Sequence, residues 1–167
     1  NPFEATIKDD KLYGRGACDM KGFLACILAF APVYSKIDLN RDIHFSFTFD
    51  EETACLGAPI LFDELKKRNI SILETQDIKE GIADVDILYM TRIQEERFNN
   101  APEANKYKGL MSLNQEIYTK NCEPNTVIMH PLPRDSRKDA NELDEDLNQN
   151  PNLAIYRQTD NGLLISC

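Results

Sequence analysis

Three short apolar runs, each ending in a group of charged residues or prolines, constrain the fold of this chain most. Runs of this length, rich in β-branched and aromatic residues, are typical of strands. Polar groups that directly follow a strand lie at the carboxyl edge of a sheet, where α/β proteins bind ligands. The pattern therefore predicts an α/β fold with functional groups at strand ends. The runs are Arg41–Phe49 before Asp50-Glu51-Glu52, Val85–Met90 before Thr91-Arg92-Ile93-Gln94, and Thr126–Met129 before His130-Pro131-Leu132-Pro133.

The remaining segments complete the α/β pattern. Apolar residues at helical spacing over Met20–Tyr34 predict a helix, with Asp19 in the N-cap position. The run Asp135–Asn152 is rich in Asp, Asn and Glu and predicts a solvated loop with one helical turn. The other expected elements are a hairpin over Ala5–Tyr13, helices over Ala58–Arg68, Asp77–Ala83, Glu103–Tyr107 and Asn114–Lys120, and strands over Ile70–Leu73 and Leu153–Tyr156.

Composition excludes some partners. The 167 residues carry a formal charge of −9, so there is no basic excess to bind nucleic acid or an anionic membrane. The apolar run Phe23–Val33 is too short for a membrane span, and no signal-peptide pattern opens the chain. Five scattered cysteines indicate reduced thiols in the cytoplasm. The start at Asn1, inside a motif, predicts a fragment of a longer reading frame.

Carboxylates dominate the chemistry of the N-terminal part. Asp19 follows two glycines in a loop that opens a helix, so it can serve as a cap or as a metal ligand. Glu51 and Glu52 are adjacent at a strand end, and they repel each other unless a cation or a shared proton relieves them. A metal-dependent hydrolase needs one group to hold the metal and another to take a proton from the metal-bound water. The alternative is a helix cap and a solvated acidic turn.

These residues stand in motifs that resemble the zinc-dependent M20 peptidase family, in particular its acetylornithine deacetylases of arginine biosynthesis. The motifs are Asn1-Pro2-Phe3, G-R-G-x-x-D-M-K-G at 14–22 and D-E-E-x-x-C-L-G-A at 50–58, with Ala54 where the family usually has glycine. The resemblance implies zinc or cobalt bound by Asp19 and Glu52, Glu51 as general base, and an N-acetyl amino acid as substrate. Other ligands of the family have no counterpart here, and zinc sites usually take three or four protein ligands.

Arg92 and Gln94 carry the chemistry of the C-terminal part. A guanidinium matches a carboxylate with two parallel hydrogen bonds, and the amide adds a donor or an acceptor. After the third run, two prolines remove backbone donors and fix φ, which leaves carbonyls in set directions and makes a cis X-Pro bond an option. The alternatives are a strand-terminating loop and an exposed cluster of ion pairs made by Arg92, Glu95, Glu96 and Arg97.

The C-terminal motifs resemble the aspartate-binding half of the carbamoyltransferase family that begins pyrimidine biosynthesis. They are D-V-D-I-L-Y-M-T-R-I-Q-E-E-R-F at 84–98, V-I-M-H-P-L-P-R at 127–134 and N-L-A-I-Y-R-Q-T-D-N-G at 152–162. The resemblance implies that Arg92 and Gln94 bind L-aspartate and that the carbonyls of Leu132 and Pro133 contact the carbamoyl group. The family is trimeric. Its carbamoyl-phosphate half and the groups supplied by a neighbouring subunit have no counterpart here, and Ser166-Cys167 breaks the expected closing helix.

The two resemblances predict a hybrid chain of two parts. The expected fold is a partial M20 zinc-hydrolase α/β unit over 1–68, followed over 69–167 by a Rossmann-like parallel-sheet half-domain of the aspartate/ornithine carbamoyltransferase type. The leading hypothesis is a carbamoyltransferase fragment that is inactive alone and has small-molecule ligands only (L-aspartate and carbamoyl phosphate). The alternatives are a zinc-dependent N-acyl amino acid deacylase fragment with a foreign tail and a binding module without catalysis.

Overall fold

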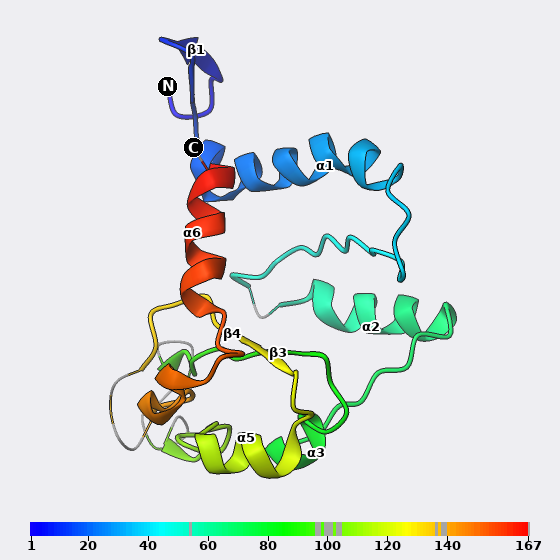
Figure 1. The fold of residues 1–167 in the computed structure, drawn as a ribbon. Coiled ribbons are helices and arrows are strands. Elements are labelled where there is room, and N and C mark those ends of the chain that lie inside the picture. Colours follow the sequence, from blue (N-terminus) through cyan, green and yellow to red (C-terminus); the bar gives the residue numbers. More distant parts are fainter. Residues whose placement is uncertain are drawn as a thin grey trace. The chain divides into compact units, whose positions relative to one another are not determined.

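The structure is a computed structural model that describes residues 1–53, 55–95, 98, 102, 105–135, 137 and 140–166, the side chains of 162–166 excepted. It divides into two compact units, Asn1–His44 with Asp160–Cys167, and Phe45–Thr159, and each is described by itself (Figure 1). The boundary between residues 68 and 69 was predicted from the two sets of sequence motifs. The compact units are defined by contacts in the fold instead, so they do not test that boundary, and it stays a prediction.

The first unit begins with the predicted hairpin. Strands β1 (Thr6–Lys8) and β2 (Lys11–Tyr13) pair antiparallel, with Ile7 opposite Leu12. Asp9 and Asp10 between them have φ values of 50° and 57°. A two-residue hairpin loop with both φ values positive matches the right-handed twist of its strands, and Asp tolerates this conformation better than most residues. The sequence prediction of a hairpin is confirmed.

Helix α1 (Gly22–Tyr34) follows the turn η1 (Ala17–Lys21) and confirms the predicted helix. The N-cap prediction for Asp19 is wrong, because Lys21 occupies that position and makes no side-chain cap bond. The η1 carbonyls already accept the first amides: Lys21 N–H donates to Gly16 O at 2.8 Å, and Gly22 N–H donates to Ala17 O. None of the α1 residues is buried, and Leu28 is 62% exposed.

The helical residues Ala17–Tyr34 form one stretch of 18 residues that is long and apolar enough to be a candidate membrane span. The sequence-based argument that no run reaches this length was therefore wrong. Asp19 and Met20 have non-helical backbone angles inside the stretch. Regular helix covers only the 13 residues of α1, which is about 20 Å against about 30 Å of hydrocarbon. The absence of a membrane partner stays a prediction.

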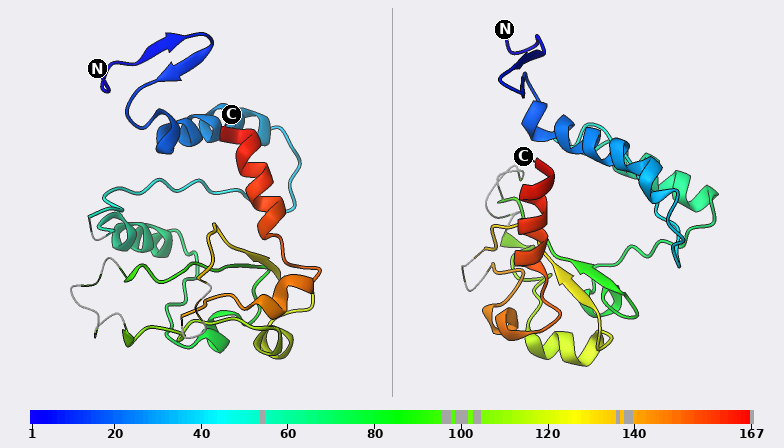
Figure 2. Two further views of the ribbon diagram at one scale, coloured as in Figure 1. Left: turned by 90° about the vertical axis from the view of Figure 1, so that its left-hand side faces the viewer. Right: turned by 45° about the horizontal axis from the view of Figure 1, so that its top comes forward.

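The second unit holds a parallel pair of strands. Strands β3 (Ile87–Tyr89) and β4 (Val127–Met129) pair in register, with Leu88 opposite Ile128, and Leu153 forms a single bridge on the other side of Ile128. Helices α3 (Ile78–Gly81) and α5 (Gln115–Asn121) lie on one side of this pair (Figures 1 and 2). The remaining described elements are α2 (Gly57–Lys67), the 3-10 helix η3 (Glu145–Gln149) and α6 (Ile155–Ser166), whose residues from Asp160 on belong to the first unit.

The core lies around this strand pair. Every buried hydrophobic side chain among the described residues lies between Ile82 and Ile155. The cluster is Ile82, Met90, Leu113, Tyr118, Ile128, Leu143, Leu147 and Ile155. Polar groups within it are paired, since Tyr118 Oη donates to Thr126 O at 2.7 Å and Thr126 Oγ1 donates to Val85 O at 2.7 Å. The cluster packs around Ile128 at the centre of β4, while Ile87 and Tyr89 of β3 are exposed.

Four sequence predictions for this part need correction. The segments 41–49 and 70–73 belong to neither sheet, although both were expected to be strands. The expected final strand at 153–156 reduces to the Leu153 bridge, because α6 begins at Ile155. The loop 135–152 has its predicted helical turn, η3, but it is not solvated throughout, since Glu142, Leu143 and Leu147 are buried. The helix predicted over 103–107 lies partly outside the described residues.

Replacement of Leu147 by alanine tests whether the core cluster of the second unit contributes most of the free energy of folding. Leu147 is fully buried in the core cluster, so we expect the change to lower the free energy of unfolding by about 2–5 kcal/mol. The matched change of Leu28 in α1 should lower it by less than about 0.5 kcal/mol, because that side chain is exposed. Urea unfolding followed by circular dichroism measures both; equal effects would contradict the assigned core.

The N-cap of α5 gives a second test. Asn114 Oδ1 accepts from Ile117 N–H at 2.8 Å. Asn114→Ala should lower the free energy of unfolding by about 1 kcal/mol, whereas Asn114→Asp keeps the acceptor and should cost much less. The same urea titration compares the two variants. A loss of equal size in both would show that the cap bond does not contribute.

Candidate functional site

The candidate site begins where β3 and β4 end. Because the two strands are parallel and Tyr89 pairs with Met129, the segments that follow them leave the sheet at the same edge. Met90 N–H extends the ladder by donating to Met129 O at 2.9 Å. The segment 91–94 and the segment 130–134 therefore start beside each other. This is the edge at which α/β proteins usually bind small ligands.

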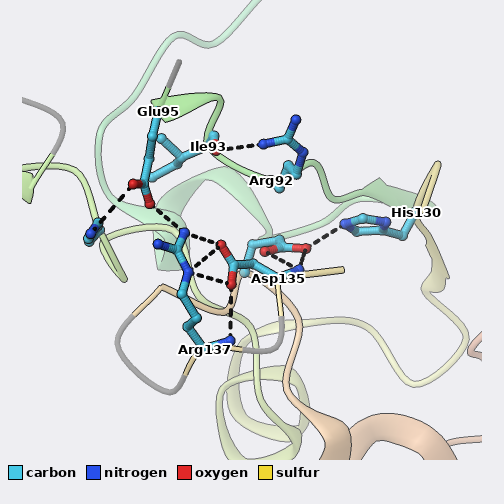
Figure 3. A network of polar contacts seen from close by, with 8 residues as sticks. Arg92, Ile93, Glu95, His130, Asp135 and Arg137 are labelled. Atoms are coloured by element: carbon cyan, nitrogen blue, oxygen red, sulfur yellow. Dashed lines mark hydrogen bonds and ion pairs between the residues drawn. The ribbon is translucent and has the colours of Figure 1, made fainter. Parts of the chain in front are cut away.

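Arg92 and Gln94 are both half-buried. Arg92 Nη1 donates to Ile93 O at 3.4 Å, and its positive charge is one of the influences that lower the pKa of Asp135 (Figure 3). The structure thus brings Arg92 close to the segment after β4. A cavity of about 590 Å³ is lined by Leu132, Pro133 and Asp135. Neither Arg92 nor Gln94 is among the described residues that line it.

Buried side chains hold the segment after β4. His130 is fully buried, and its Nε2 lies 2.7 Å from Glu142 Oε1. Leu132 N–H donates to His130 Nδ1 at 2.8 Å, and Asp135 N–H donates to both Glu142 oxygens at 3.2 and 3.3 Å. The Leu132–Pro133 bond is cis, and Leu132 has a φ of 59°. Three residues at the edge, His130, Leu132 and Asp135, are therefore tied to a single buried carboxylate or to the imidazole that it contacts.

A network of ions ties the two segments together (Figure 3). Arg137 Nη2 lies 2.5 Å from Glu95 Oε1 and 2.5 Å from Asp135 Oδ2, and Lys108 Nζ lies 3.6 Å from Glu95 Oε2. The guanidinium of Arg137 holds the pKa of Asp135 well below its usual range, at about 2. It also lowers the pKa of Glu95, and the two carboxylates raise the pKa of Arg137.

The alternative of an ion-pair cluster made by Arg92, Glu95, Glu96 and Arg97 lies partly outside the described residues and stays a prediction. Glu95 pairs across the fold with Arg137. Its side chain is half-buried. Glu96 and Arg97 lie outside the described residues. The sequence analysis missed Arg137 and Glu142, because both stand in a polar run that predicts solvent exposure; a signal for Glu142 is that the buried His130 needs a partner.

The N-terminal site residues are exposed. Asp19 lines a depression of about 790 Å³ in the first unit, together with Arg15 and Cys18. Glu51 and Glu52 stand in the second unit, in a turn after Phe49 that Gly57 N–H closes by donating to Phe49 O at 3.2 Å. A side chain at Gly57 would meet the Phe49 backbone at 2.7 Å, so glycine is required there.

The metal ligands predicted for the N-terminal part are not brought together within either unit. Among the described residues, no three His, Cys, Asp or Glu side chains form a group that could hold a metal ion. His44 is exposed, and His130 is committed to the contact with Glu142. The residues present therefore do not fit a tightly held zinc ion, which usually takes three or four protein ligands.

Comparison with known families gives two results that overlap along the chain. The sequence model of peptidase family M20/M25/M40 matches residues 1–137. This match extends past the predicted boundary at residue 68. The predicted junction between the two parts therefore stays a prediction.

The curated relatives are of another kind. The aspartate carbamoyltransferase catalytic subunit of Saccharophagus degradans is 69% identical over 91 residues, which is 54% of this chain and 27% of that protein. The subunit of Cellvibrio japonicus is 58% identical over 105 residues, 63% of this chain and 31% of that protein. The subunit of Dichelobacter nodosus is 40% identical over 130 residues, which is 77% of this chain and 36% of that protein. The chain thus spans about a third of the length of these relatives.

Solved structures agree with these relatives. The catalytic subunit of M. jannaschii aspartate transcarbamoylase has a TM-score of 0.53 at 31% identity, covering 65% of this chain and 33% of that chain. The Trypanosoma cruzi enzyme in complex with carbamoyl aspartate and phosphate has a TM-score of 0.55 at 26% identity, with the same coverage. The chain belongs to peptidase family M20/M25/M40 by its match over residues 1–137, and its curated relatives and structural neighbours are catalytic subunits of aspartate carbamoyltransferase.

Proposed function

We propose that the second unit is the amino-acid-binding half of an aspartate carbamoyltransferase and that it binds a small dicarboxylate of the aspartate class. The observation that carries this proposal is the parallel register of β3 and β4, which starts the Arg92 and Leu132 segments at the same sheet edge. In this proposal Arg92 and Gln94 hold the carboxylates. The carbonyls of Leu132 and Pro133 accept from a carbamoyl or amide group.

The chemistry of these groups suits that ligand. A guanidinium in a half-buried place is only partly screened by solvent, so its hydrogen bonds to a carboxylate are stronger than on an open surface. Pro133 has no N–H and its ring fixes φ, so this segment offers acceptors more than donors. An anion-binding side chain and a set of carbonyl acceptors at one edge match a ligand that has a carboxylate at one end and an N–H group at the other.

We propose that the chain alone does not transfer the carbamoyl group. Transfer requires both substrates to be held together in a productive geometry. The chain spans about a third of the length of the relatives it matches, and none of the residues proposed for the site is a group that would bind the phosphate of carbamoyl phosphate. Binding of a dicarboxylate is therefore the activity that the described residues support.

The M20 family match favours a second candidate, a zinc-dependent deacylase, with Asp19 and Glu52 as metal ligands and Glu51 as base. We infer that this activity is lost, because the described residues form no group of three ligands. Zinc titration followed by calorimetry tests the inference. One tightly bound zinc ion per chain, released by Glu52→Gln, would favour the deacylase.

The proposed site also depends on the ion network that joins its two segments. Arg137 contacts Glu95 on one segment and Asp135 on the other. Because Asp135 also lies in the field of Arg92, its charge helps to hold the guanidinium at the site before a ligand arrives. The network is thus proposed to pre-organise the site, not to contact the substrate.

Replacement of Arg92 by alanine tests ligand binding directly. In the wild-type chain we expect succinate, an aspartate analogue without the amine, to raise the melting temperature. Arg92→Ala should weaken succinate binding by about 10- to 100-fold, because hydrogen bonds to a charged group contribute about 1.5–3 kcal/mol. Differential scanning fluorimetry across a succinate series measures the change. Arg68→Ala, on the exposed end of α2, is the matched control, and an undiminished rise in Arg92→Ala would sink the proposal.

The low pKa of Asp135 predicts an acid-dependent loss of stability. Its folded pKa of about 2 lies below the unfolded value of about 3.9, so its contribution is fully present above about pH 4 and is lost as the pH falls toward 2. Asp135→Asn removes this contribution. We expect the variant to be less stable at neutral pH and to show a shallower loss between about pH 4 and 2. Urea midpoints measured across that range test this, and parallel curves for both chains would contradict it.

A further inference from the structure

We propose that Glu142 is a positioning residue of the candidate site: it selects the tautomer of His130, and through that ring it fixes the backbone of Leu132 and Pro133. The inference rests on the function proposed above, in which the carbonyls of these two residues face the ligand. Glu142 lies behind the segment and does not line the surface offered to a substrate, since its side chain is 3% exposed.

Because His130 and Glu142 are both buried, their contact determines the hydrogen bonding of the imidazole ring. His130 is 0% exposed, so neither ring nitrogen can exchange its protein partner for water. Nε2 lies 2.7 Å from Glu142 Oε1, and Nδ1 lies 2.8 Å from the Leu132 nitrogen. Buried polar groups without partners are costly, so the ring keeps both contacts together.

The two contacts assign the proton on the ring. Leu132 N–H is a donor, so Nδ1 must present its lone pair, and the proton of the neutral imidazole stands on Nε2. That proton points at a carboxylate, which can only accept when ionised. In the opposite tautomer an Nδ1–H would face the Leu132 N–H, and a lone pair would face the carboxylate. Glu142 therefore favours the one tautomer that can accept from Leu132.

The Leu132 backbone is the part that needs this support. Its φ of 59° lies in the left-handed region, which a leucine adopts only when its surroundings hold it there. The bond from its N–H to Nδ1 is such a restraint, and Asp135 N–H is held by the same carboxylate three residues later. With Pro131 and Pro133 fixing φ on either side, the directions of the carbonyls at 132 and 133 are set from behind.

A second support reaches His130 by a separate route. Its backbone N–H donates to Gln158 Oε1 at 3.1 Å, and Gln158 Nε2 donates to Tyr89 Oη at 2.8 Å. These bonds hold the main chain of His130 and do not depend on the ring tautomer. A change at Glu142 therefore acts on the imidazole without releasing the strand end.

The test observes the ring in the full chain without ligand. Nitrogen-15 NMR of the imidazole distinguishes the Nε2–H form of the neutral ring from the Nδ1–H form. We expect the Nε2–H signature in the wild-type chain. Glu142→Gln should mix the two forms, because an amide can donate as well as accept, and it should speed hydrogen exchange of the Leu132 amide by about fivefold or more.

Two further variants separate positioning from general destabilisation. Tyr118→Phe removes a buried hydrogen bond away from the site and should leave the tautomer unchanged. His130→Asn supplies an oxygen that can accept from the N–H two residues on without any tautomer, so adding Glu142→Gln to it should leave the Leu132 exchange rate nearly unaltered. The effect of Glu142→Gln on Leu132 exchange should therefore depend on the presence of His130. A role of Glu142 in general stability alone would not give this dependence.

The test of the positioning role and the test of the proposed function can fail independently. An Nδ1–H signature in the wild-type chain, which needs no variant to fold, would overturn the positioning role. So would Glu142→Gln with an unchanged ring, or an equal effect of Glu142→Gln in the His130→Asn background. Failure of succinate to raise the melting temperature of the wild-type chain would instead remove the dicarboxylate function, and the ring measurement would be unaffected.

Discussion

The parallel pairing of β3 with β4 is the constraint on which the rest of the second unit depends. The strands are far apart in the sequence, so their pairing closes a long loop and must be repaid by burial. Ile128, fully buried at the centre of β4, supplies part of that burial, and it bridges to Leu153 on the other side. Because both functional segments start one step beyond this pair, its register fixes which of their residues face each other.

Sequence patterns predicted the elements whose signals are local. The strands at 87–89 and 127–129, and α5 with its Asn114 cap, were all expected, because a short apolar run with a sharp end or a capped helical pattern is complete in itself. The alternation over 41–49 was as regular, yet this segment joins neither sheet. A strand needs a neighbour, and a run of residues does not encode which neighbour the fold supplies.

The candidate site divides in the same way. Arg92 and the residues after β4 were found because each follows an apolar run that predicts a sheet edge. Glu142 was missed because it stands among many acidic and amide residues, a composition that predicts solvent exposure. Only the fold shows which carboxylate in that run turns inward. The signal was indirect: a histidine directly after a buried strand must find a partner, and the partner can come from any segment that returns to the sheet.

Burial also distinguishes the segment after β4 from the exposed carboxylates of the N-terminal motifs. Among the described residues, the buried hydrophobic side chains all lie in the second unit, whereas no residue of α1 is buried. Apolar burial is the main favourable term in folding. The second unit therefore holds most of the folding free energy, and a site built on it can be pre-organised. Asp19 in the first unit and Glu51 in the second both stand on exposed turns, without the buried hydrogen bonds that hold the segment after β4.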